Sequence, residues 1–265
     1  MHEQSSLLST SRPSSLGRTL FWLVFYAAIL VGWVGLMHMM ASPLPGMTSA
    51  EYWAALCISA GGSDPLALFA MWGLMSAAMM LPTFVPAARV FGDLATVRAT
   101  DGASMAALVL GYGAVWLVFS TFAAALQLGL SKAGAASGAG QLLSPWLSAG
   151  LLATAGVYQF SSAKEACLAK CRHPLMFFME HWAPGLQPAF AMGARLGIWC
   201  VGCCWLLMLL GFVGGAMNIL WMGAATLFMA MEKLPEIGRY LTKPLGAALL
   251  VGAIAQVISA YSSGG

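Results

Sequence analysis

Sulfur-bearing side chains are the part of this sequence best suited to chemistry. Three cysteines stand within five residues at Cys200, Cys203 and Cys204, and Met208 follows one helical turn later. Thiolate and thioether sulfurs are soft ligands that favour Cu(I) over hard cations such as Mg²⁺ or Ca²⁺. The group predicts a soft-metal site, with packing of small side chains between helices as the alternative interpretation.

A stripe of methionines supplies a second set of soft ligands. Met71, Met75 and Met79 are spaced four residues apart and share one helical face, and Met80 lies beside them. The hypothesis is that Cu(I) passes between this helix, the cysteine-bearing helix and the predicted span at 215–232. Methionine is also a common apolar filler, so ordinary packing remains the alternative.

A third group of candidate ligands lies in residues 163–195. Cys167 and Cys171 are one turn apart on a predicted helical extension of the preceding span, and His173 follows them. The basic residues that flank the two thiols should lower their pKa values and favour the thiolate, which is the metal-binding form. Glu180, in the same segment, is either a solvated residue or a further ligand, as is its neighbour His181. The alternative for the cysteine pair is packing against the bundle.

Two smaller groups complete the candidate ligands. His38 stands among three methionines, where a neutral imidazole and thioethers would accept or release copper at the outer mouth of the protein. Met217 is a candidate ligand that forms a second methionine pair with Met222 at about one-turn spacing. We expect Asn218 beside it to be a buried amide that orients a ligand.

The elements that must position these residues are membrane helices. The chain has 265 residues, of which 60% are hydrophobic and only 8% are charged, with a mean hydropathy of +0.82. A soluble domain has about 25% charged residues, so this composition excludes one. A net charge of +3 gives no basis for nucleic-acid binding, and six cysteines are too few for a disulfide scaffold.

Charge-free stretches predict an all-α bundle of about seven spans, because a spanning helix needs about 20 apolar residues. The 36 uncharged residues between Arg195 and Glu232 are too long for one span and divide at the glycines of 211–215. Residues 1–19 are predicted to form a tail and 20–262 a single transmembrane domain. The predicted spans cover residues 20–40, 65–88, 103–130, 143–162, 190–211, 215–232 and 244–261.

The distribution of Lys and Arg predicts the orientation, since these residues accumulate on the cytoplasmic side. With a cytoplasmic N-terminus, eleven of the twelve basic residues fall inside and only Lys132 falls outside. This pattern predicts a multi-pass membrane protein with 163–195 as a cytoplasmic loop. No ionisable residue lies deep in a predicted span, which argues against a proton-coupled pump.

Several strings in the chain together resemble a known family. They are the methionine-rich 75–82, Tyr158-Gln159 with the cysteine pair that follows, Gly202-Cys-Cys-Trp205, Met217-Asn218 with Trp221-Met222, and Glu232-Lys233. Over roughly residues 65–260 the chain resembles the bacterial family of predicted metal-binding integral membrane proteins. That family is related to the membrane copper chaperones associated with tyrosinase maturation. The resemblance implies copper delivery by a protein of a bacterial inner membrane.

The sequence therefore predicts a membrane Cu(I) chaperone that serves a cuproenzyme and is not itself an enzyme. Its expected partners are the lipid bilayer and a cuproenzyme or other membrane protein, with no nucleic acid; the oligomeric state stays open. One alternative is a metal-free subunit or assembly factor that docks through small-residue helix faces. The other is a membrane thiol oxidoreductase that uses either Cys203 and Cys204 or the loop pair, by which we mean Cys167 and Cys171. A reducing cytoplasm disfavours a disulfide in the loop pair.

Overall fold

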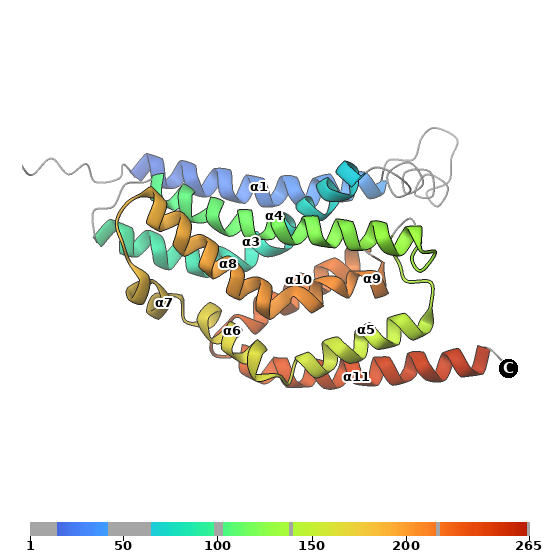
Figure 1. The fold of residues 1–265 in the computed structure, drawn as a ribbon. Coiled ribbons are helices and arrows are strands. Elements are labelled where there is room, and N and C mark those ends of the chain that lie inside the picture. The colour runs from blue at the N-terminus through green and yellow to red at the C-terminus, as the bar shows by residue number, and fades with distance from the viewer. Residues whose placement is uncertain (1–14, 42–64, 98–102, 138–139, 216–217, 264–265) are drawn as a thin grey trace, which may run out of the picture.

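The computed structural model describes residues 15–41, 65–97, 103–137, 140–215 and 218–263, and these form helices joined by turns (Figure 1). No strand occurs within those ranges, so the predicted all-α class is confirmed. Five of the described helices are long and apolar enough to cross a membrane. They are α1 (Ser15–Ala41), α3 (Pro65–Val97), α4 (Ala103–Lys132), α8 (Leu186–Leu209) and α11 (Gly238–Ser263).

The other two predicted spans are also helices, but short ones. These are α5 (Pro145–Tyr158) and α10 (Ile219–Glu232), each of 14 residues. At a rise of 1.5 Å per residue each is about 21 Å long, less than the hydrocarbon thickness of about 30 Å. The number of complete crossings therefore stays a prediction, although the helices of all seven segments run back and forth along one direction (Figure 1).

The glycine-rich reversal before α10 lies where the sequence places it. The single turn α9 (Gly211–Gly214) ends at Gly215, whose φ is +88°. This left-handed conformation costs little only for glycine, because other residues carry a Cβ that clashes. The chain turns here from α8 into α10.

Two short helices, α6 (Ser162–Arg172) and α7 (Pro174–His181), lie in the chain between α5 and α8 (Figure 1). The prediction that α6 extends the preceding span is wrong. The Ser161 side chain accepts a hydrogen bond from the Lys164 backbone N–H at 3.1 Å, so α6 begins as a separate capped helix. It packs against α8, and this contact places its two cysteines beside the cysteines of that helix.

Helices α4 and α8 lie close together because each has a glycine that packs against the backbone of the other. A Cβ built on Gly193 would meet the backbone oxygen of Leu108, and one built on Gly111 would meet that of Phe190. Small residues let helix backbones approach in this way in membrane proteins. As a result Tyr112 of α4 reaches Cys200 of α8, with 3.0 Å between its hydroxyl oxygen and the sulfur.

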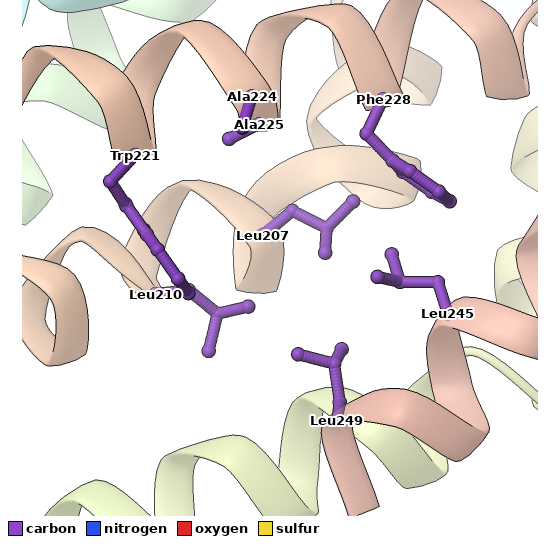
Figure 2. Close-up of a pocket in the computed structure, with 8 residues that line it drawn as sticks. All are labelled: Leu207, Leu210, Trp221, Ala224, Ala225, Phe228, Leu245 and Leu249. Atoms are coloured by element: carbon purple, nitrogen blue, oxygen red, sulfur yellow. The ribbon is translucent and has the colours of Figure 1, made fainter. Parts of the chain in front are cut away.

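A pocket between α8, α10 and α11 is apolar and separate from the sulfur ligands (Figure 2). Its lining supplies hydrocarbon and one indole ring, and neither is a ligand for a metal cation. The candidate metal site must therefore be sought elsewhere. The lining residues are Leu207, Leu210, Trp221, Ala224, Ala225, Phe228, Leu245 and Leu249.

Candidate metal centre

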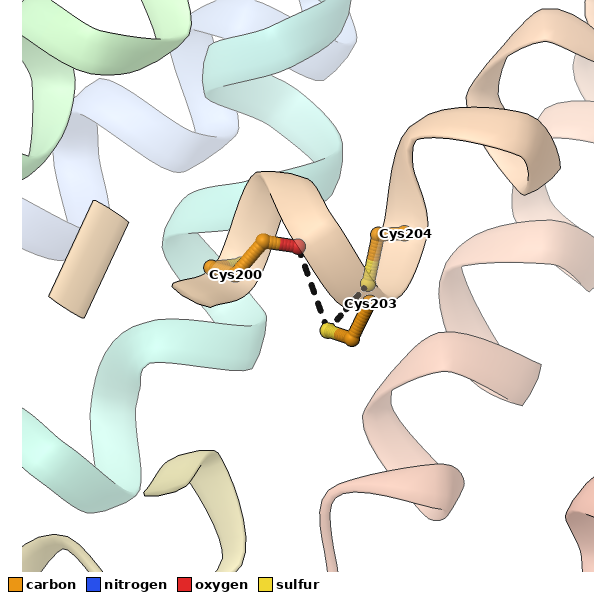
Figure 3. Close-up of side chains that lie close together, drawn as sticks. All are labelled: Cys200, Cys203 and Cys204. Carbon is orange, nitrogen blue, oxygen red and sulfur yellow. Dashed lines mark hydrogen bonds between the residues drawn. The ribbon is translucent and has the colours of Figure 1, made fainter. Parts of the chain in front are cut away.

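Three thiols meet on one face of α8 (Figure 3). The spacing i, i+3, i+4 places Cys200, Cys203 and Cys204 together, and their sulfurs all lie within 4.8 Å of one another. The sulfur of Cys203 is 3.1 Å from that of Cys204 and donates to the Cys200 carbonyl oxygen at 3.1 Å. Each cysteine is 1% exposed, so this group, which we call the cysteine cluster, is screened from water.

Helix α6 adds two further thiols to the cysteine cluster. The Cys171 side chain interacts with those of Cys200 and Cys203. The Cys167 sulfur packs against Gly202, where a built Cβ would lie 2.6 Å from it. Both α6 cysteines are half-buried. The loop pair and the α8 cysteines, which the sequence presents as separate groups, therefore lie side by side.

The expectation that basic neighbours lower the pKa values of the α6 thiols is wrong. Burial raises the pKa of Cys167, and a hydrogen bond to the Cys200 side chain raises the pKa of Cys171. The reason is that the basic side chains of α6 are directed at other partners. Lys164 pairs with Glu232, Lys170 pairs with Glu180, and Arg172 binds Glu165 and the Glu232 carbonyl oxygen.

The raised pKa of Cys167 predicts slow alkylation at neutral pH. A thiol with a raised pKa holds less thiolate at a given pH, and the thiolate is the nucleophile. In a variant that keeps Cys167 as its only cysteine, the maleimide rate should still rise with pH where that of N-acetylcysteine has levelled off. A stopped-flow pH series measures both rates. A plateau at lower pH than the free thiol would contradict the burial effect.

Three side chains that the sequence analysis did not name as site residues lie at the cysteine cluster, two in contact with Cys200 and the third in contact with one of those two. The Lys233 Nζ donates to the Cys200 sulfur at 2.9 Å and to the Thr83 Oγ1 at 2.6 Å. The Tyr112 hydroxyl lies 3.0 Å from the same sulfur and 3.3 Å from the Met80 carbonyl oxygen. Because these residues come from α10, α3 and α4, no local spacing reveals them. The one sign of them in the sequence is the string Glu232-Lys233, which is among the strings that carry the family resemblance.

The predicted methionine ligands that the structure describes are buried, but the described contacts tie only one of them to the cysteine cluster. Met71, Met75, Met79 and Met80 of α3 and Met208 of α8 are at most 6% exposed. The Met80 sulfur lies 4.0 Å from Thr83 Oγ1, which in turn contacts Lys233. Burial alone does not distinguish a ligand from a packing residue. Met80 is the methionine best placed to bind the metal, because its sulfur contacts a side chain of the site. Met229, which the sequence analysis missed, is also fully buried in α10.

Other candidate residues lie apart from the cysteine cluster. His173 is exposed where α6 meets α7. Glu180 and His181 lie on α7, and the His181 Nδ1 is 3.0 Å from the Phe177 carbonyl oxygen. The side chain of His38 and the whole of Met217 lie outside the described residues.

The prediction of a buried, ligand-orienting amide at Asn218 is wrong. Asn218 is exposed, and its side-chain oxygen accepts the backbone N–H groups of Leu220 and Trp221 at 3.1 and 3.2 Å. These contacts cap the first turn of α10. The side chain is therefore committed to the start of a helix.

A buried ion pair lies next to the centre. Lys164 Nζ is 2.9 Å from Glu232 Oε2, and both side chains are 1% exposed. The other carboxylate oxygen of Glu232 has no hydrogen-bond partner among the described residues. The sequence places these residues outside the predicted spans or at the edge of one, but the packing of α6 on the end of the bundle buries them.

Residues 69–256 match the family model of the copper chaperone PpoB2, and this range is more than two thirds of the chain. The chain belongs to the PpoB2 copper chaperone family. The matched range contains all five cysteines described above, the methionines of α3 and Lys233. No curated protein and no solved structure matches the chain.

The donor set fits the cargo of a copper chaperone. Five thiols and one adjacent thioether are soft donors, and no carboxylate or imidazole belongs to the compact ligand group among the described residues. A buried thiol cluster in a family of copper chaperones indicates metal binding. The predicted α8 cysteines are thus gathered in one place, together with the loop pair.

Proposed function

We propose that this protein is a membrane Cu(I) chaperone, which binds the ion at the cysteine cluster and passes it to a cuproenzyme. The observation that carries the proposal is the gathering of three sulfurs within 4.8 Å in a buried site. Cu(I) is stable with two or three soft ligands, and thiolates are preferred. Membership of the copper chaperone family supports the same cargo.

The two α6 cysteines suggest how the ion reaches the cluster. Cys167 and Cys171 are less buried than the α8 thiols and contact the same helix surface. Cu(I) would enter by exchanging one thiolate at a time, from Cys167 to Cys171 and then to Cys200 or Cys203. Each step keeps the ion coordinated, so free copper is never released.

The direction and the location belong to the same proposal. The distribution of basic residues favours an orientation with α6 at the cytoplasmic face, and we place the protein in a bacterial inner membrane. The ion would then be received from the cytoplasmic side and delivered to an enzyme in or across the bilayer. Met80 and the methionine stripe of α3 offer weaker, exchangeable ligands beyond the thiols.

The proposal is tested by the copper content of the detergent-purified protein. The protein is loaded with Cu(I) without oxygen, challenged with bathocuproine disulfonate, and analysed by mass spectrometry for retained metal. We expect the wild type and Cys57→Ser, which changes the cysteine that the proposal leaves out, to retain copper. The triple variant Cys200→Ser, Cys203→Ser, Cys204→Ser should lose it, because a hydroxyl is a poor ligand for a soft cation.

Two results would contradict the proposal. A wild type that retains no copper would favour a docking subunit without metal. A triple variant that retains as much copper as the wild type would place the metal elsewhere. Mass mapping under non-reducing conditions distinguishes a thiol oxidoreductase, which would show a reversible disulfide among these cysteines.

A further inference from the structure

The side chain of Lys233 is an unusual feature of the centre, because it brings an ammonium group into the interior. The residue is 8% exposed and caps the C-terminal end of α10. Its Nζ donates to the Cys200 sulfur at 2.9 Å and to Thr83 Oγ1 at 2.6 Å. A buried charge is costly unless it is paired and hydrogen-bonded.

The charge of Lys233 has the cysteine cluster as its partner. None of the ion pairs between described residues joins a carboxylate to Lys233, and the neighbouring Glu232 pairs with Lys164. The groups that interact electrostatically with the ammonium include Cys171 of α6, Tyr112 of α4 and the three cysteines of the cysteine cluster. The positive charge of Lys233 is therefore compensated by negative charge on the cysteine sulfurs.

Thr83 and Tyr112 hold this arrangement in place. The Thr83 hydroxyl donates to the Met80 carbonyl oxygen at 2.9 Å, which leaves its oxygen lone pair for Lys233. The Tyr112 hydroxyl contacts Cys200 from α4. The ammonium is thus fixed on Cys200 from a helix that carries no cysteine of the cluster.

This geometry has a consequence for metal charge. The thiol of Cys203 donates to the Cys200 carbonyl oxygen and therefore carries its proton, which leaves two thiols of the cysteine cluster to bind as thiolates. A monovalent ion bound by two thiolates carries a net charge of −1, which one ammonium neutralises. A divalent ion bound by the same two thiolates is already neutral, so the ammonium would leave a buried net charge of +1. A buried site of low dielectric favours the neutral combination.

We infer that Lys233 is a positioning residue that selects a monovalent metal. This inference rests on the proposed function. Lys233 keeps its hydrogen bond to Cys200 when that sulfur binds the ion, since a thiolate has lone pairs for both. It supplies the counter-charge of a Cu(I) dithiolate and disfavours Zn²⁺ at the same sulfurs. Groups that hydrogen-bond to metal ligands commonly change metal affinity by 10- to 100-fold.

The test compares Cu(I) and Zn²⁺ affinities by anaerobic competition titration with chelators of known affinity. Lys233→Met removes the charge at similar size, Lys233→Arg keeps it, and Lys170→Met removes an exposed lysine that pairs with Glu180. We expect Lys233→Met to weaken Cu(I) binding by about 10- to 100-fold while Zn²⁺ binding is unchanged or tighter. Lys233→Arg and Lys170→Met should keep the wild-type ratio of the two affinities.

A chemical rescue separates charge from packing. Lys233→Ala should show the same loss of Cu(I) preference, and added propylammonium should restore it where propanol does not. If Lys233→Met and Lys233→Ala fail to fold, Lys233→Arg decides alone, and a lost preference in that variant overturns the inference. Equal loss of both metals in Lys233→Met, or no change in either, also overturns it. A wild type that binds no Cu(I) contradicts the proposed function instead.

Discussion

Lys164→Met is expected to destabilise the protein by about 3–5 kcal/mol, because it leaves the Glu232 carboxylate buried without its cation. The two side chains are 2.9 Å apart and both are 1% exposed. The substitution removes the positive charge but keeps a side chain of similar length. Chemical or thermal unfolding in detergent, followed by tryptophan fluorescence, measures the effect.

The double variant Lys164→Met, Glu232→Gln should recover most of that loss. Replacing both members of a buried pair with neutral groups is often neutral or stabilising, and one Glu232 oxygen already lacks a hydrogen-bond partner among the described residues. Glu232→Gln alone should be costly for the same reason as Lys164→Met. A complete double-mutant cycle gives the coupling energy of the pair.

The exposed pair Lys170–Glu180 is the matched control. Its nitrogen and oxygen are 3.2 Å apart, but the side chains are 41% and 60% exposed. Exposed pairs contribute about 0–1 kcal/mol, so Lys170→Met should change stability little. A Lys164→Met variant as mild as this control would show that water reaches the buried pair.

The long helices of this fold were predictable because a bilayer imposes a simple rule on sequence. Charge-free stretches of about 20 residues mark spans, and each predicted span contains a helix in the structure. The lengths of α5 and α10 were not predictable. The segment 143–162, for example, carries no charged residue either in the helix or in the turn that follows it, so the absence of charge does not show where the helix ends. Ser161 starts α6 through a single cap contact.

The cysteines of α8 were predictable from their spacing, since i, i+3 and i+4 share a face whatever the surrounding fold. Their neighbours were not. They are separated from Cys200 by 33 to 117 positions in the chain and come near it only through helix packing. Tyr112 and Lys233 contact its sulfur, and Thr83 contacts Lys233. Lys233 in particular follows the end of a span, where a lysine ordinarily faces the membrane surface.

The same reasoning explains why the α6 thiols were misjudged. Sequence adjacency suggests that Lys170 and Arg172 act on Cys171, but a helix directs successive side chains in different directions. The basic groups turn towards Glu180, Glu165 and the end of α10. Cys171 turns towards α8.

The second large effect is expected at the contact between α4 and α8. Gly111→Ala should destabilise the protein by about 1–3 kcal/mol or more, because an added Cβ would overlap the backbone of Phe190 and lie 2.9 Å from the Ala194 nitrogen. Backbone atoms cannot move aside as a flexible side chain can, so the two helices must separate. Unfolding in detergent measures the loss of stability.

Gly113→Ala is the matched control, two residues away on the same helix. A Cβ at Gly113 would meet nothing within 4 Å, and alanine favours the helix over glycine by about 1 kcal/mol. This variant should be as stable as the wild type or slightly more so. Equal effects of the two substitutions would contradict close packing at Gly111.

The Gly111 substitution should also affect the metal centre. Tyr112 follows Gly111 directly, and its hydroxyl lies 3.0 Å from the Cys200 sulfur. Separation of α4 from α8 would withdraw this group and open the cysteine cluster to water. We therefore expect Gly111→Ala, but not Gly113→Ala, to speed the reaction of the α8 thiols with maleimide in the folded protein. Equal rates in the two variants would show that the glycine contact does not control access to the cluster.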